Sequence, residues 1–190
     1  VFQNPRSQFF CLDTSSELAF GCENLGMPVE QINERVKYAA EELELENLLD
    51  RDIFKLSGGE KQRIACGSVS AMLPDIIVLD EPTSNLDAES IELLKRILAL
   101  WKKQNKTIII AEHRLYWLKD ICDRAVYLSD GKIQMDIPMR ELTDYSEQKM
   151  EKLGLRSINA DFQSQINKSD WSPPSQNEPD TITLKDYVFA

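Results

Sequence analysis

The stretch LSGGEKQRIACGSVSAMLPDIIVLDEPTSNLD, residues 56–87, decides how the rest of the chain is interpreted. Its apolar run, residues 76–79, lies between two prolines and is followed directly by Asp80 and Glu81. A short apolar run bounded by turn residues is typical of a strand that is buried on both faces of a parallel sheet. Ligand crevices of open α/β sheets lie at the carboxyl ends of the strands, so we expect the acidic pair to face a ligand.

A turn of serine and glycine opens the same stretch. Ser57 and Glu60 form the pattern S-x-x-E, which predicts a capping box at the start of a helix that ends near Pro74. This interpretation needs no ligand. Gly58 and Gly59 favour a second one, because glycines weaken a helix but let a phosphate approach backbone amides at its positive end.

Two further elements follow the acidic pair. Asp87 is a candidate N-cap for a helix over residues 88–104. Trp101 belongs to the apolar stripe of this helix, so we predict a packing role for it and not a nucleotide platform. Residues 107–110 form a second apolar run, a predicted buried strand, which is followed closely by His113. A lone histidine is usually structural, but its place at the carboxyl end of a second strand favours catalysis.

The order of these motifs, LSGGE, IIVLDEP, SNLD and then an isolated histidine, resembles the nucleotide-binding domain of ABC ATPases. The phrases SELAFGCENLGMP and AEHRLYWL are similar to the ATPases of energy-coupling-factor importers for vitamins and metal ions. The resemblance covers roughly residues 1–135. It implies an α/β fold of the P-loop NTPase type, in which helices flank a mainly parallel sheet and a helical subdomain carries the signature loop.

The resemblance also implies roles for individual residues. Glu81 would orient or deprotonate the attacking water, and His113 would hold that water and the γ-phosphate, so these two are the expected catalytic residues. Asp80 and Gln3 would hold Mg²⁺. The residues expected to bind ATP are Gln3 of the Q-loop, Ser57, Gly58, Gly59 and Glu60 of the signature loop, and Asp87 of the D-loop. The signature loop would complete the ATP site of an opposing subunit. Taken alone, Gln3 is an exposed polar residue before a turn.

One motif of the family is not in the sequence. A phosphate loop has the form GxxxxGK[ST], and its nearest approach, residues 21–26, is followed by Met27 and Pro28 in place of Lys and Ser or Thr. We therefore expect an incomplete domain, whose N-terminal phosphate-loop part precedes Val1. Alone, these 190 residues are expected neither to bind ATP tightly nor to hydrolyse it.

The predicted domain organisation has three parts. Residues 1–155 would form the C-terminal two-thirds of an ABC ATPase domain, with a helical subdomain at 14–57. Residues 156–180 are polar and contain two adjacent prolines, which predicts a linker. Residues 181–190 would form the first strand of a second ABC ATPase domain in a tandem protein. The alternative is a C-terminal tail that folds over its own domain.

Local patterns predict the supporting elements. Ser15 and Ser16 are candidate N-caps for a first helix, and Pro28 begins a second one. Asp130 and Gly131 predict a hairpin turn between two strands that finish the ATPase sheet. The remaining predictions are a helix over 114–122 and a charged helix over 139–153 that lies outside the core.

Composition limits the function classes. The net charge of −10 and the lack of a basic stripe argue against a nucleic-acid partner. The four cysteines show no paired spacing and there is one histidine, so a zinc site is not expected. The sequence contains no run of 18 apolar residues that would predict a membrane span, so any membrane role is expected to come through partners. The resemblance implies a peripheral protein at the cytoplasmic face of the cell membrane. The expected partners are integral-membrane transport subunits and a second ABC ATPase domain.

The resemblance implies an ATP-hydrolysing subunit that powers uptake of a vitamin or metal ion through an importer. Two alternatives remain at this point. One is an ABC-type ATPase that is not coupled to transport. The other is a module without enzymatic activity.

Overall fold

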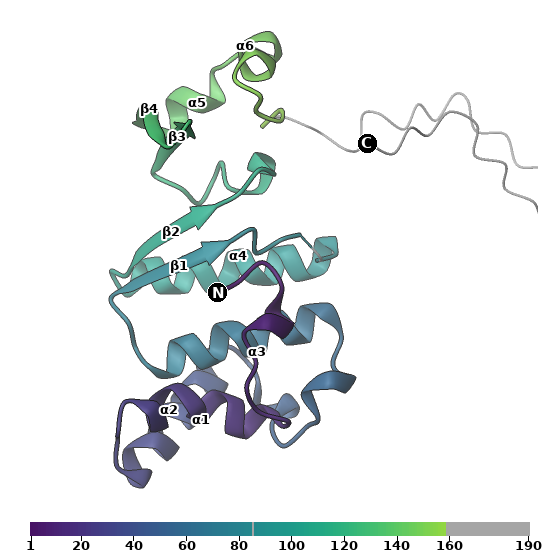
Figure 1. Ribbon diagram of the computed structural model, residues 1–190, viewed down its shortest axis with the longest axis vertical. Helices are drawn as coiled ribbons and strands as arrows, with labels where there is room; N and C mark the ends of the chain where they lie inside the picture. The colour runs from purple at the N-terminus through teal and green to yellow at the C-terminus, as the bar shows by residue number, and fades with distance from the viewer. Residues whose placement is uncertain (85, 159–190) are drawn as a thin grey trace, which may run out of the picture. The chain divides into compact units, whose positions relative to one another are not determined.

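The computed structural model describes residues 1–84 and 86–158, which lie within one compact unit, Val1–Asn159. Three helices pack together in its N-terminal half: α1 (Thr14–Asn24), α2 (Val29–Glu42) and α3 (Gly58–Ala71), with α1 in contact with both others. Figure 1 shows this group beside the parallel strands β1 and β2. Three short 3₁₀ turns connect the group, at Pro5–Ser7, Glu46–Leu48 and Ile53–Lys55.

The starts of α1 and α2 follow from their flanking residues. Asp13 caps α1, because its Oδ1 accepts a hydrogen bond from the backbone N–H of Ser16 at 2.9 Å. The predicted caps were therefore wrong: Ser15 lies inside the helix, where its hydroxyl donates to Oδ1 of Asp50. The helix predicted at Pro28 is confirmed, since α2 begins one residue later.

Gly67 lets the buried helix α3 approach the rest of the core closely. A Cβ atom at this position would lie 2.6 Å from Leu45 Cδ1 and 2.7 Å from Leu18 Cδ2. Both leucines are fully buried, so neither has space to move aside. The two leucine side chains therefore already fill the space beside residue 67, and no room is left for a side chain there.

Gly67→Ala is expected to lower the free energy of unfolding by about 1–3 kcal/mol, because overpacking outweighs the better helix propensity of alanine. The denaturant midpoint of the protein would measure this. The matched control is Gly21→Ala in α1, whose added Cβ would meet the flexible end of Met72, with Sδ at 2.5 Å. A smaller loss is expected there. Equal midpoints for wild type and Gly67→Ala would contradict the packing argument.

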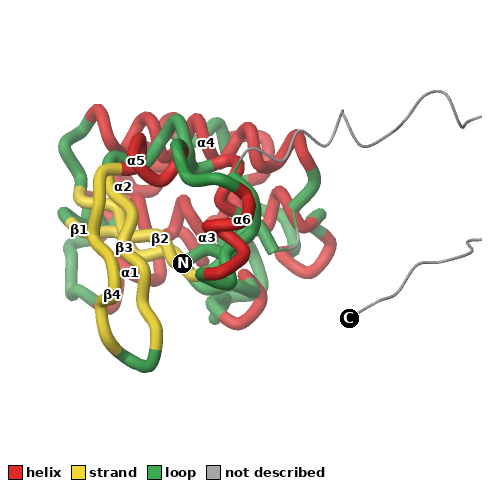
Figure 2. The backbone as a smooth tube through the Cα atoms, turned by 90° about the horizontal axis from the view of Figure 1, so that it is seen from above, coloured by secondary structure: helices red, strands yellow, loops and turns green. Residues whose placement is uncertain are grey.

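Strands β1 (Ile76–Asp80) and β2 (Thr107–Ala111) run parallel, in a register that aligns Asp80 with Ala111. Helix α4 (Ala88–Lys103) connects them and contacts β2. Figure 2 shows α4 running along the strands on one side. Trp101 of α4 is fully buried in the hydrophobic core, which confirms its predicted packing role.

The prediction that β1 is buried on both faces was wrong. Ile77 and Leu79 are buried, but Ile76 is 60% exposed and Val78 is 54% exposed. Side chains alternate between the faces of a strand, and in the described part of the chain α4 and the core cover one face only. The pattern of burial in β2 alternates as well, and Ile109 is exposed on the open side.

A hairpin follows, formed by β3 (Arg124–Ser129) and β4 (Lys132–Pro138). Asp130 and Gly131 both have positive φ angles, 51° and 70°, as a two-residue turn of type I′ requires, so the predicted turn is confirmed. The prediction that these strands finish the ATPase sheet is not met within the described residues. There they pair only with each other, and the apolar side chains of one face attach them to the core. The described sheets are thus one parallel and one antiparallel pair, which is a mixed α/β arrangement.

Two helix predictions after β2 were wrong. Residues 114–122 form a 3₁₀ turn at Leu115–Trp117 and further i→i+3 turns, with backbone bonds from Leu118 to Leu115 and from Ile121 to Leu118. The apolar residues in this segment recur every three positions, which suits three residues per turn. The charged helix is two short ones, α5 (Met139–Thr143) and α6 (Glu147–Lys152), and Ser146 caps the second. Both contribute to the core through three buried side chains, Met139, Leu142 and Met150.

Part of the predicted domain organisation falls outside the described residues. This concerns the linker over 156–180, apart from its first three residues, and the strand over 181–190. No helix in the described part of the chain combines the length and the apolar character that crossing a bilayer requires.

Candidate active site

Three of the predicted site residues meet in one place. The amide Nε2 of Gln3 donates a hydrogen bond to Oε2 of Glu81 at 2.6 Å. The Nδ1 atom of His113 lies 3.5 Å from Oε1 of the same carboxylate. The side chains of Glu81 and His113 are 34% and 40% exposed, so a ligand can reach them. The acid and the imidazole therefore share one site, as the sequence predicted.

Gln3 reaches this place because the chain before it pairs with β1. The N–H of Val1 donates to the carbonyl of Val78 at 2.6 Å, and the N–H of Asp80 donates to the carbonyl of Val1 at 3.0 Å. This is the bonding of a parallel neighbour, so Gln3 follows at the same edge of the sheet as Asp80 and Glu81.

The backbone of Glu81 is in a conformation that non-glycine residues rarely adopt. Its φ angle is +39°, directly after the last residue of β1. Its N–H donates to the carbonyl of Ala111 at 2.8 Å, so the sharp turn is fixed to β2. Strained residues of this kind cluster at functional sites when the surroundings hold them in place. Here the turn directs the Glu81 carboxylate toward both Gln3 and His113.

The donor set fits a magnesium ion together with a nucleotide. Asp80 is exposed at the end of β1, and the amide oxygen of Gln3 is not used by the bond to Glu81, which involves Nε2. Magnesium prefers oxygen ligands and keeps several waters, so one carboxylate, one amide oxygen and phosphate oxygens suffice. In the described residues no group of three or more His, Cys, Asp or Glu side chains could hold a metal ion by itself.

The signature-loop residues form the start of α3. Ser57 Oγ accepts a bond from the N–H of Glu60, and the Glu60 carboxylate accepts one from the N–H of Ser57 at 2.8 Å, a complete capping box. This backbone bond also lowers the pKa of the Glu60 carboxyl. Gly59 lies directly against Ser90 of α4, where a Cβ atom would collide with the serine hydroxyl. No hydrogen bond within the described residues joins the capping box to Glu81 or His113.

Asp87 caps α4, as the sequence predicted. Its Oδ1 accepts the backbone N–H of Ser90 at 2.8 Å, and this bond lowers the pKa of the Asp87 carboxyl. The carboxylate is thereby directed toward its own helix and not toward Glu81.

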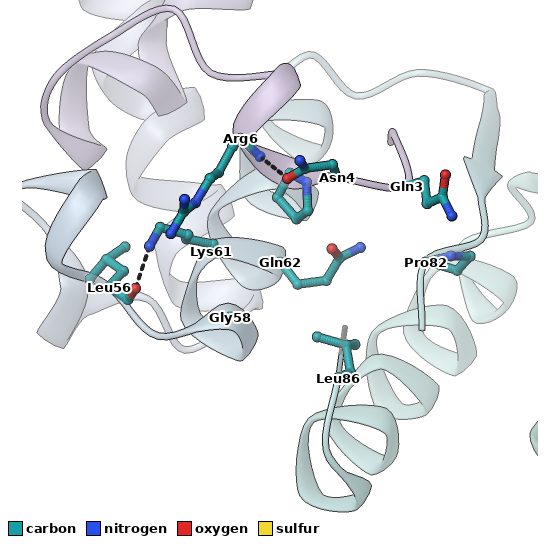
Figure 3. A pocket seen from close by; sticks show the side chains of 10 residues that line it. Gln3, Asn4, Arg6, Leu56, Gly58, Lys61, Gln62, Pro82 and Leu86 are labelled. Carbon is teal, nitrogen blue, oxygen red and sulfur yellow. Dashed lines mark hydrogen bonds between the residues drawn. The ribbon is translucent and has the colours of Figure 1, made fainter. Parts of the chain in front are cut away.

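A pocket of about 360 Å³ lies between the Q-loop segment and α3. Figure 3 shows Gln3 on one side of it, Gly58 and Gln62 on the α3 side, and Pro82 and Leu86 of the segment after β1. The amide of Gln62 is buried and its Nε2 has no hydrogen-bond partner in the described part of the chain. The pocket thus joins a Q-loop residue and a signature-loop residue in one cavity.

Two residues near the site were not singled out in the sequence. The side chain of Glu112 is 1% exposed and its Oε1 lies 3.4 Å from His113 Nδ1. Thr83 is fully buried and donates its hydroxyl hydrogen to Glu112 Oε2 at 2.6 Å. A signal for Glu112 existed in the sequence, because this acid directly precedes His113 at the end of the second predicted strand.

The arrangement can supply some of the parts that attack of water on a phosphoryl group requires. A carboxylate that can orient or deprotonate water lies beside an imidazole and an amide, at the carboxyl ends of parallel strands. The fold and this edge of the sheet define the class: an α/β domain with a candidate ligand site at the carboxyl ends of parallel strands.

Comparisons with known proteins place the chain within that class. Residues 1–84 match the family model described as ABC transporter. Two proteins of Treponema denticola that carry the name ABC transporter ATP-binding protein are 50% identical over 159 residues and 40% identical over 190 residues. These matches include 84% and 100% of this chain. The chain contains part of an ABC transporter ATP-binding domain and belongs to that family.

Solved structures agree with this assignment. CbiO1 from Clostridium perfringens, part of the ABC transporter complex CbiONQ, matches with a TM-score of 0.70 and 30% identity over 82% of this chain and 62% of that one. An ABC transporter of the metal-chelate type, in an inward-facing conformation, has the same fold at a TM-score of 0.68 and 23% identity. The present chain spans 32% and 38% of the length of the two Treponema relatives.

Proposed function

We propose that the protein hydrolyses ATP to drive uptake of a vitamin or metal ion through an importer of the energy-coupling-factor kind. The observation that carries this proposal is the contact of Gln3 and His113 with the Glu81 carboxylate, within a chain of the ABC transporter ATP-binding family. The likeness to CbiO1, which is part of an ABC transporter complex, supports the coupling to transport.

Each residue has a chemical task in this proposal. Glu81 accepts or orients the proton of the attacking water, and His113 holds that water and the γ-phosphate by hydrogen bonds. Asp80 and the amide oxygen of Gln3 would hold magnesium, which neutralises phosphate charge when it is bound. Positioning and charge stabilisation then supply most of the rate acceleration.

The signature loop serves a second protein face. Ser57, Gly58, Gly59 and Glu60 begin a helix whose positive end suits a γ-phosphate, and they form no hydrogen bond to Glu81 within the described residues. We therefore assign this loop, with Asp87 of the D-loop, to the ATP site of an opposing ABC ATPase domain. The phosphate loop would come from a part of the domain outside these 190 residues, since GxxxxGK[ST] is not among them.

Copurification tests the coupling to transport. When the whole protein is expressed with its neighbours and purified mildly, we expect integral-membrane subunits in stoichiometric amounts and magnesium-dependent ATP turnover in the same complex. The protein would then lie at the cytoplasmic face of the cell membrane. Magnesium-dependent turnover by a protein that never associates with membrane subunits would favour the alternative, an ABC-type ATPase not coupled to transport.

A further inference from the structure

Glu112 is a buried acid beside the site for which the proposed mechanism has no use. Its side chain is 1% exposed, and burying a carboxylate is costly unless hydrogen bonds replace its water. Three donors do so: the Thr83 hydroxyl on Oε2 at 2.6 Å, and the backbone N–H groups of His113 and Arg114 on Oε1 at 2.9 and 3.0 Å. Bonds to a charged acceptor are stronger than those between neutral groups.

These bonds join two separate segments. His113 and Arg114 belong to the loop after β2, whereas Thr83 belongs to the turn after β1, two residues beyond Glu81, the proposed general base. A second hydrogen bond joins the same two segments: Arg114 Nη1 donates to the carbonyl of Thr83 at 3.4 Å. The same carbonyl accepts the N–H of Leu86 at 3.2 Å, so the connection extends toward the D-loop.

The geometry points to Glu112 as a positioning residue that holds the His113 loop against the turn after the acidic pair, through Thr83. His113 Nδ1 lies 3.5 Å from Glu81 Oε1 because both backbones are held by this contact and by the bond from Glu81 N–H to Ala111. The inference rests on the proposed ATPase function. It adds that the His113 imidazole and the Glu81 carboxylate are held in place by a shared buried carboxylate, that of Glu112.

Replacement of Glu112 by alanine removes the acceptor of all three bonds. We expect the kcat for ATP hydrolysis by the whole protein to fall about 10-fold to 100-fold, since displacement of a reacting group by about 1 Å can cost that much. The KM for ATP is expected to change little, because His113 is the one proposed nucleotide contact that Glu112 supports: within the described residues Glu112 forms no hydrogen bond with Gln3 or with the signature loop. Glu112→Gln should keep most of the activity. Its amide oxygen can accept both backbone hydrogen bonds, and its amide nitrogen can donate to the hydroxyl oxygen of Thr83.

Substitutions of Thr83 test the hydrogen bond between Thr83 and Glu112 at its donor. Thr83→Val is nearly the same size but lacks the hydroxyl, so kcat should fall in the same direction as in Glu112→Ala. Thr83→Ser keeps the hydroxyl and should retain most of the turnover. The matched control is Thr143→Val in α5, where the hydroxyl donates to the carbonyl of Arg140 in its own helix. Together Glu112→Ala and Thr83→Val should lower kcat less than the product of the two single effects.

A His113→Ala background separates positioning from general destabilisation. If Glu112 acts by placing His113, Glu112→Ala causes no further loss of kcat once the imidazole is gone. Loss of folded protein would instead lower turnover by the same factor in both backgrounds. Bound nucleotide per protein molecule, measured on each preparation, normalises the rates to the folded fraction.

Three results would overturn the inference: wild-type kcat in Glu112→Ala, wild-type kcat in Thr83→Val, or an equal further loss from Glu112→Ala when His113 is absent. Should Glu112→Ala fail to fold, the two Thr83 variants and Glu112→Gln still decide. A protein that hydrolyses ATP and is stopped by Glu81→Gln, but is indifferent to these changes, refutes only this inference. A wild-type protein without ATPase activity refutes the proposed function itself.

Discussion

Glu81→Gln is expected to lower ATP turnover of the whole protein by at least about 100-fold, the lower bound of the usual contribution of a general base. The amide has the size of the carboxylate, and its oxygen can still accept the bond from Gln3 Nε2. It cannot accept a proton from water at neutral pH. Nucleotide binding should therefore persist while turnover stops.

The measurement combines two assays on one preparation. Steady-state phosphate release gives kcat, and equilibrium binding of Mg·ATP gives the affinity. Glu92→Gln is the control, because Glu92 is an exposed acid on α4 that forms an ion pair with Lys95 on the same helix. Full turnover in Glu81→Gln would remove Glu81 from its proposed role.

Trp101→Ala is expected to lower the free energy of unfolding by about 3–5 kcal/mol, as for other large-to-alanine changes in cores. Trp101 is fully buried among the residues of the main core, so its loss leaves a large cavity. Denaturant unfolding monitored by far-UV circular dichroism measures the loss.

The milder variant Trp101→Phe tests the packing role against a role in nucleotide binding. The indole Nε1 has no hydrogen-bond partner in the described part of the chain. Replacement by phenylalanine therefore reduces the volume of the side chain but removes no hydrogen bond. We expect a smaller loss of stability and an unchanged affinity for ATP. A selective loss of affinity in a fully folded Trp101→Phe protein would show that the indole contacts the nucleotide.

The residues of the site could be predicted from sequence because their order along the chain is distinctive. Two apolar runs that each end in polar residues predicted that Glu81 and His113 would meet, and the parallel register of β1 and β2 brings them together. Local chemistry also sufficed for the Asp87 cap and for the hairpin turn at Asp130, since each depends on residues nearby in the chain.

Features that depend on distant contacts could not be predicted. Burial of β1 on two faces was inferred from its composition, but Ile76 and Val78 are uncovered because exposure depends on which elements pack there. The helix predicted over 114–122 was wrong because the apolar residues there recur every three positions, and this spacing was interpreted as that of an α-helix. The connection from Glu112 to Thr83 joins residues 29 positions apart, and only the folded chain shows that it exists.

The left-handed turn at Glu81 has an evolutionary consequence. A residue with a side chain costs about 1–2 kcal/mol in such a conformation, whereas glycine adopts it freely. A screen of random substitutions for thermal stability alone would therefore favour glycine at position 81. The selected variants would be more stable but would lack the carboxylate proposed for ATP hydrolysis. Glutamate at position 81 therefore costs stability, and the proposed role of its carboxylate in ATP turnover accounts for that cost.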